Sequence, residues 1–151
     1  VGSEMCIRDR YQEHIFISDG DKASRKYIGI LLQINDIKYF APLSSFKVKH
    51  KKMKESVDFI KIHNYAVINL NNMIPVPEGE YSLVDVNGTK DQQYRYLMQA
   101  ESREINRQKN RIMKNADIVY KHKLRNGNST PLAKRTNNFV ELEKRYRIYY
   151  R

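Results

Sequence analysis

The spacing of hydrophobic residues changes near Asp91, and this change limits the possible folds more than any other feature of the sequence. Before Asp91, short runs rich in β-branched and aromatic residues predict strands at 26–34, 37–43, 65–70 and 81–86. After Asp91, apolar residues recur every three or four positions over about 30 residues, which is the spacing of an amphipathic helix. Strands followed by helices predict an α+β fold with an antiparallel sheet and a helical C-terminal half.

Turn residues and prolines divide the strand region further. Asn35 and Asp36 predict a hairpin turn between the first two strands. The segment NNMIPVPEGE, residues 71–80, contains two prolines, which exclude a central strand or a helix there.

The helical region should also be divided. Its pattern is longer than a typical globular helix, so we expect a break between Asn106 and Asn110. The segment RNGNSTP, residues 125–131, should end the pattern. A last helix should begin near Asn138, which is spaced from Glu141 as an N-terminal cap would be. The apolar face of this helix would contain Phe139, Leu142, Tyr146 and Tyr149.

The 151 residues suffice for one domain with a buried core, and we assign that domain to residues 11–151. The leader VGSEMCIRDR, residues 1–10, mixes charges without an apolar stretch and is interpreted as a non-native, adaptor-like segment. The single cysteine, Cys6, excludes an internal disulfide and fits a cytoplasmic protein. The longest apolar run, residues 27–32, is too short to cross a bilayer, so no membrane association is expected.

The net charge of +11 is concentrated in the second half of the chain. Residues 1–89 contain 12 basic and 11 acidic side chains, whereas residues 90–151 contain 16 basic and 6 acidic ones. Basic side chains that neutralise phosphates release condensed counterions, so an excess of this kind favours a polyanionic partner. Because no segment shows a broad apolar face for a membrane surface, nucleic acid is the preferred partner.

The sequence lacks the motifs of several enzyme classes. The four histidines lie far apart, and there is no HExxH motif or carboxylate cluster, so we expect neither a metal ion nor a metal-dependent nuclease. Walker, GxGxxG and GxSxG motifs are missing as well, and no cofactor is expected. Of the four histidines, His50 is interpreted as a solvated member of a basic face and His63 as a hydrogen-bonded framework residue.

The segment SSFKVKHKKMK, residues 44–54, places two serines before five lysines and allows two interpretations. In the first, Ser44 or Ser45 caps a short helix and has no further role. In the second, the segment holds a phosphate. Lys47 and Lys49 would lie near the start of the helix, where the helix dipole disfavours cations, and a bound anion would remove that conflict.

Four segments of the sequence, KYIGILLQIN, IKYFAPLSSFK, VINLNNMIPV and NFVELEKRYR, resemble the ToxN/AbiQ family of type III toxin–antitoxin endoribonucleases. The resemblance extends from about Arg25 to Tyr149. It implies a compact, twisted antiparallel sheet flanked by helices, related to the SH3-like barrel of Kid/MazF toxins. It also implies a catalytic set made of Ser44, Ser45, Lys47 and Arg25. Phe46 replaces a frequent proline, and Tyr11 would be a remnant of an N-terminal helix.

The expected function is sequence-specific, metal-independent RNA cleavage, in which the ribose 2′-hydroxyl attacks the adjacent phosphorus and leaves a 2′,3′-cyclic phosphate. The resemblance further implies inhibition by a repeated, structured RNA antitoxin in a closed protein–RNA ring, and a role in phage defence. Basic residues outside the catalytic set are predicted to bind RNA: Lys49, His50, Lys51, Lys52, Arg107, Lys109, Arg111, Lys114, Lys121 and Lys123. The alternative is a non-catalytic RNA-binding module.

Overall fold

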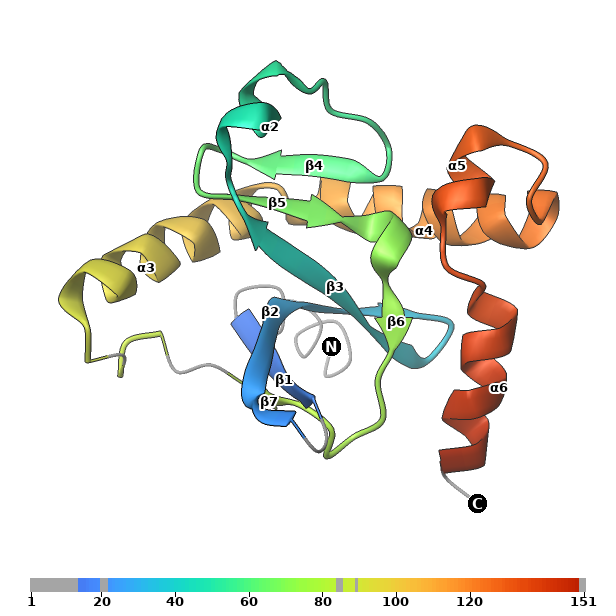
Figure 1. Ribbon diagram of the computed structural model, residues 1–151, viewed down its shortest axis with the longest axis horizontal. Coiled ribbons are helices and arrows are strands. Elements are labelled where there is room, and N and C mark those ends of the chain that lie inside the picture. The colour runs from blue at the N-terminus through green and yellow to red at the C-terminus, as the bar shows by residue number, and fades with distance from the viewer. Residues whose placement is uncertain (1–13, 20–21, 84–85, 89, 150–151) are drawn as a thin grey trace.

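The computed structural model describes residues 14–19, 22–83, 86–88 and 90–149. The expected leader and Tyr11 lie outside these residues. The described strands form one antiparallel sheet in the order β4-β5-β3-β2-β1-β7, with β6 paired to β3, and the helices follow in the C-terminal half (Figure 1). The α+β prediction is therefore confirmed. The pairings run from β4 to β7 as an open sheet.

The centre of the sheet is the predicted hairpin of β2 (Lys22–Ile34) and β3 (Ile37–Ser45). Asn35 and Asp36 both have positive φ, at 49° and 66°, as a two-residue hairpin turn requires. Gly29 lies opposite Pro42, and a Cβ atom at this position would stand 2.3 Å from the carbonyl oxygen of Ala41. The close approach of the two strands therefore depends on glycine at position 29.

The remaining strands extend this hairpin on both sides. β1 (His14–Asp19) pairs with β2, and the two-residue β7 (Ser82–Leu83) pairs with β1. β5 (Ala66–Asn69) pairs with β3 and with β4 (Phe59–Ile62), a strand that was not predicted from the sequence. The proline-rich segment contains a 3-10 turn, η1 (Leu70–Asn72), and the two-residue strand β6 (Ile74–Pro75). The prediction that the prolines exclude a central strand is confirmed, because β6 lies off the main path, where a proline is tolerated.

The helical half contains α3 (Gln92–Arg107), α4 (Lys109–Asn126), the unpredicted α5 (Pro131–Arg135) and α6 (Phe139–Tyr149). The break at Gln108 falls where it was predicted. The amide oxygen of Asn138 accepts a hydrogen bond of 3.2 Å from the backbone N–H of Glu141, so this cap is confirmed. Of the predicted apolar face of α6, Phe139 is fully buried, whereas half of Tyr149 is exposed.

Helix α4 packs its apolar stripe onto the sheet. Ile112, Ala116, Val119 and Tyr120 are buried together with Tyr39 and Phe139. Burial of this apolar surface is the main stabilising contribution to the fold. None of the helices in the described part of the chain is long and apolar enough to span a membrane.

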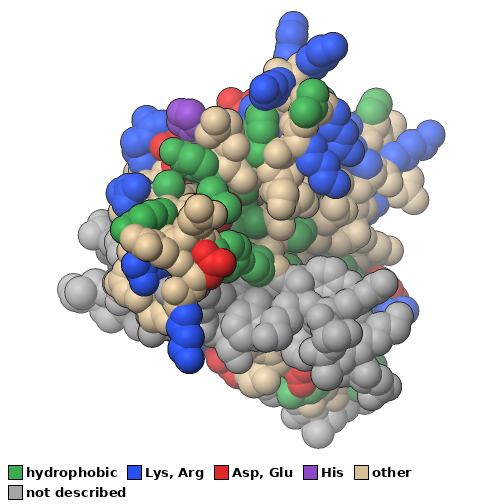
Figure 2. Space-filling view, turned by 60° about the vertical axis from the view of Figure 1, so that its left-hand side comes forward, with side chains coloured by type: hydrophobic (Ala, Val, Ile, Leu, Met, Phe, Trp, Pro, Cys, Tyr) green, Lys and Arg blue, Asp and Glu red, His purple; other side chains and the backbone are tan. Residues whose placement is uncertain are grey.

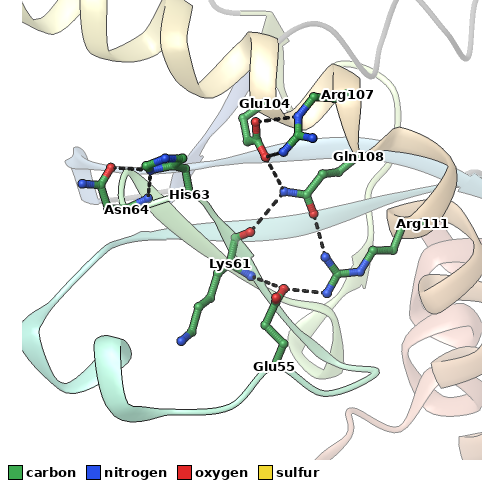
Figure 3. Close-up of polar contacts among 8 residues, drawn as sticks. All are labelled: Glu55, Lys61, His63, Asn64, Glu104, Arg107, Gln108 and Arg111. Carbon is green, nitrogen blue, oxygen red and sulfur yellow. Dashed lines mark hydrogen bonds and ion pairs between the residues drawn. The ribbon is translucent and has the colours of Figure 1, made fainter.

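The break between α3 and α4 is held against β4 by hydrogen bonds from side chains (Figure 3). The Gln108 amide donates to the carbonyl oxygen of Lys61 at 3.3 Å and to the Glu104 carboxylate at 2.8 Å. Arg111 donates to Gln108 at 2.8 Å and to Glu55 at 2.5 Å, and Glu55 also accepts from the backbone N–H of Lys61. These contacts fix α3 beside the end of the sheet at which β3 reaches Ser45.

Candidate functional site

Ser44 and Ser45 are the last two residues of β3, and both side chains are exposed. Their backbones pair with Val67 and Ala66 of β5. The prediction that one of them caps the following helix was wrong, because strand pairing with β5 keeps both serines extended. The two hydroxyl groups therefore stand at the open end of a strand.

The helix after the serines is α2 (Val48–Lys52), and its N-cap is Lys47. The second interpretation placed a phosphate at the N-terminus of this helix, and the helix is a single turn. The N–H of Lys47 itself is already bound to the Nδ1 atom of His50 at 2.8 Å. Positive charge at this site therefore comes from exposed lysine side chains, of which Lys47 lies closest to the serines along the chain.

The interpretation of His50 as a solvated residue was wrong. His50 is 6% exposed, with its ring centroid 5.6 Å from that of Phe46 and 5.8 Å from that of Phe59. Burial, together with the positive charges of Lys49, Lys47 and Lys61, lowers its pKa below the ordinary value. A buried neutral imidazole is not placed to contact an RNA phosphate. The prediction that His50 binds RNA was therefore wrong.

His63 is exposed and hydrogen-bonded, in line with its predicted framework role. Its Nδ1 accepts from the backbone N–H of Asn64 at 2.8 Å, and its ring stacks on Tyr65 with centroids 5.1 Å apart. The positive φ of 50° at His63 forms the turn between β4 and β5. This turn lies beside Phe46, whose N–H donates to the carbonyl oxygen of Tyr65.

A cleft of about 360 Å³ adjoins the serines. Ser44, Ser45 and Phe46 line one side, and Tyr94, Leu97, Met98 and Glu101 of α3 line another. Figure 2 shows the face on which α3 lies, where hydrophobic side chains gather and Lys and Arg side chains lie above and beside them. Burial and the nearby Glu101 carboxylate raise the pKa of Tyr94, which keeps its hydroxyl protonated.

The contribution of α3 to this cleft was not predicted. Its apolar residues were interpreted only as a core-facing stripe, yet Tyr94 and Leu97 are 42% and 39% exposed. Their spacing is the same for a core and for a cleft wall, so the sequence pattern contains no signal that separates the two roles.

Arg25, the fourth predicted catalytic residue, belongs to β2, and its side chain lies outside what the structure describes. The β2–β3 register places Gly29 opposite Pro42. Arg25 lies four residues before Gly29 in β2, which is toward the end of the sheet that contains Ser45. Lys47 follows Ser45 by two residues, separated from it by Phe46.

The residues predicted to bind RNA fall into different classes. Lys49, Lys51, Lys52 and Lys114 are exposed, and Lys109 is half-buried. Arg107, Arg111 and Lys121 are exposed but form ion pairs with Glu104, Glu55 and Asp117. The prediction that Lys123 binds RNA was wrong. Lys123 is 9% exposed, and its ammonium group donates to Asn128 and to the carbonyl oxygen of Ala133. Its charged group therefore forms hydrogen bonds within the protein instead of facing solvent.

No group of three or more His, Cys, Asp or Glu side chains suited to a metal ion occurs among the residues that the structure describes. The expectation that RNA cleavage needs no metal stays a prediction.

Comparison with known proteins identifies the relatives of this chain. Residues 9–147 match the family model "Toxin ToxN, type III toxin-antitoxin system". The chain is 34% identical to Endoribonuclease ToxN of Pectobacterium atrosepticum over 133 residues, which cover 83% of this chain and 75% of that protein. It is 33% identical to Endoribonuclease ToxN of Bacillus thuringiensis subsp. kurstaki over 105 residues, which cover 67% of this chain and 54% of that protein.

A solved structure shares the fold over nearly its whole length. It comes from work described as "A processed non-coding RNA regulates a bacterial antiviral system", with a TM-score of 0.74 and 26% identity. The matched region covers 89% of this chain and 97% of that one. The sheet and the C-terminal helices are therefore shared with this solved structure.

Proposed function

The chain belongs to the ToxN toxin family of type III toxin–antitoxin systems and is an endoribonuclease toxin, and we propose that it cleaves RNA at the end of β3 without a metal ion. The observation that carries this assignment is the exposed Ser44–Ser45 pair, which lines a cleft directly before a lysine-rich helical turn. Hydroxyl and ammonium groups are both available there to contact one phosphate.

The proposed reaction is an intramolecular transfer at phosphorus. The ribose 2′-oxygen forms a bond to the adjacent phosphorus, and the bond from phosphorus to the 5′-oxygen breaks. The 2′-hydroxyl loses its proton to a base, and the departing 5′-oxygen gains one. The products are a 2′,3′-cyclic phosphate and a 5′-hydroxyl, so this step consumes no water.

The residues have separate roles in this proposal. Lys47 and Arg25 stabilise the negative charge that grows on the non-bridging oxygens, and the serine hydroxyls orient the phosphate. Losing one preorganised donor of this kind typically costs about 100-fold to 1,000-fold in rate. Neither serine is assigned as a covalent nucleophile, because no histidine base adjoins them in the sequence.

The exposed lysines of α2 and the basic outer face of α4 would hold the rest of the RNA. We propose that a structured RNA antitoxin occupies the same surface, blocks the cleft and joins toxin copies into a closed ring. The processed non-coding RNA named for the structural relative supports this partner, and its antiviral system supports a role in phage defence. The proposed place of action is the cytoplasm, where RNA substrates are found.

The decisive test is incubation of the folded protein with a long RNA in EDTA. Cleavage to products that end in a 2′,3′-cyclic phosphate supports the proposal. Replacing the ribose before the cleaved bond by 2′-deoxyribose should abolish cleavage at that bond alone. RNA that is bound but stays intact with and without divalent metal would overturn the catalytic assignment and support the non-catalytic binding module.

A further inference from the structure

His50 is attached to the backbone of a proposed catalytic residue. Its Nδ1 atom accepts a hydrogen bond of 2.8 Å from the backbone N–H of Lys47, and its own backbone N–H donates to the carbonyl oxygen of Lys47 at 2.9 Å. Two hydrogen bonds thus fix the peptide groups on both sides of the Lys47 Cα atom. The Lys47 side chain itself is exposed.

The imidazole is enclosed by groups that disfavour its protonation. Phe46 and Phe59 pack against the ring, and His50 is 6% exposed. The charged groups that act on it are Lys47 and Lys49 from its own segment and Lys61 from β4, all of which are positive. Burial, followed by these charges, lowers the pKa of His50, so the ring is neutral at neutral pH and its Nδ1 can accept.

We propose that His50 is a positioning residue for RNA cleavage, which holds the backbone of Lys47 in its active geometry only while the imidazole is neutral. This inference rests on the proposed function of Lys47. It makes the toxin an enzyme that loses activity in acid through a group that contacts neither RNA nor phosphate.

The chemistry of imidazole explains the loss. In the protonated ring both nitrogens carry hydrogen, so Nδ1 no longer accepts from Lys47 and two donors face each other. The same proton places a buried cation near three ammonium groups. The N-cap turn must open to relieve both conflicts, and the Lys47 side chain moves with it. A displacement of about 1 Å at a reacting centre can cost about 100-fold in rate.

The variant His50→Asn separates this role from a purely structural one. An asparagine side-chain oxygen can accept from the Lys47 N–H as Nδ1 does, and the amide does not titrate. We expect wild-type kcat to fall about tenfold per pH unit below an acid midpoint under 6.5, the ordinary histidine value. The variant should retain kcat at neutral pH within about fivefold and should show no fall over the same range.

His63→Asn is the matched control. His63 also accepts a backbone N–H through Nδ1, at 2.8 Å from Asn64, but it is exposed and has no bond to Lys47. The acid fall in kcat should persist in this variant. The KM for RNA should not rise in acid in the wild type, because protonation adds positive charge and strengthens attraction to phosphates.

An acid fall in kcat that persists in folded His50→Asn would overturn the inference while leaving the cleavage assignment intact. Absence of RNA cleavage by the wild type at every pH would instead count against the proposed function. If His50→Asn does not fold, nitrogen NMR of the wild type decides. The inference is supported if Nδ1 is unprotonated at neutral pH and becomes protonated at the same pH at which kcat falls to half. A protonated Nδ1 at neutral pH overturns it.

Discussion

The hydroxyl group of Tyr39 in β3 donates a hydrogen bond of 2.5 Å to the carboxylate of Glu143 in α6, although the two residues are 104 positions apart in the chain. Tyr120 of α4 donates to the same carboxylate at 2.7 Å. Burial and this carboxylate raise the pKa of both tyrosines, that of Tyr120 to about 12, so both remain donors at all ordinary pH values. One buried carboxylate therefore joins the sheet to two helices.

Replacing Glu143 by alanine should destabilise the protein, because two buried hydroxyl groups would lose their acceptor. Each unsatisfied buried group costs about 1–3 kcal/mol, so we expect a loss of about 3 kcal/mol in the free energy of unfolding, measured by urea denaturation. Glu141→Ala is the control, since Glu141 lies on the exposed side of α6 and its pairing with Arg145 is worth about 0.5 kcal/mol. Equal losses in the two variants would contradict this role of Glu143.

Arg135→Ala should weaken the attachment of α5. The Arg135 guanidinium donates two hydrogen bonds, at 2.7 and 2.8 Å, to the buried carboxylate of Asp58. Removing the guanidinium leaves the buried carboxylate without its cationic partner. Because Arg135 itself is half exposed, we expect the free energy of unfolding to fall by about 2 kcal/mol, which is less than for fully buried pairs. Lys134→Ala removes the same charge from an exposed neighbour and should change the unfolding free energy little.

The same pair predicts how stability depends on pH. Burial alone would raise the pKa of Asp58, but hydrogen bonds from Arg135 and Ser56 and the guanidinium charge outweigh it and lower the pKa below the ordinary 3.8. This stabilisation is complete above pH 3.8 and is lost as the pH falls below that value. Acid titrations followed by circular dichroism should therefore show a smaller fall in stability for Asp58→Asn than for the wild type. An identical fall would argue against the Asp58 contribution.

Ser45→Ala and Lys47→Ala should each lower the rate of RNA cleavage by about 100-fold or more, because each removes a group that we propose contacts the reacting phosphate. RNA affinity should stay within about tenfold, since the other basic residues predicted to bind RNA would supply most of the binding charge. Cleavage is measured in EDTA, and affinity by fluorescence anisotropy. Ser129→Ala and Lys144→Ala are exposed controls and should cleave normally. Normal cleavage by either test variant would refute the catalytic set.

Lys52→Ala should weaken RNA binding, whereas Lys123→Ala should lower the stability of the protein. Lys52 is exposed, so its loss should lower the slope of log affinity against log salt by about 0.7 for a single-stranded RNA, with stability unchanged. Lys123 is buried with two hydrogen bonds, so its loss should leave that slope unchanged and lower the unfolding free energy by about 2 kcal/mol. A reduced salt slope in a folded Lys123 variant would show that its charge reaches the RNA.

Local patterns in the sequence determined much of the fold. The hairpin around Asn35 and Asp36, the break at Gln108 and the cap at Asn138 all agree with the structure. Each depends on residues that are neighbours in the chain, so turn chemistry and hydrophobic spacing are sufficient to predict it. The stretch around Ser44 and Ser45 was likewise singled out by its residues alone.

Tertiary contacts decided what the neighbouring residues could not. Ser44 and Ser45 remain in β3 because β5, more than 20 residues later, supplies their pairing partners. His50 and Lys123 have the sequence context of solvated charges, yet Phe59 covers the first and the carbonyl of Ala133 binds the second. A side chain is buried or exposed according to distant segments that pack against it, and that packing is a property of the folded chain rather than of the local pattern.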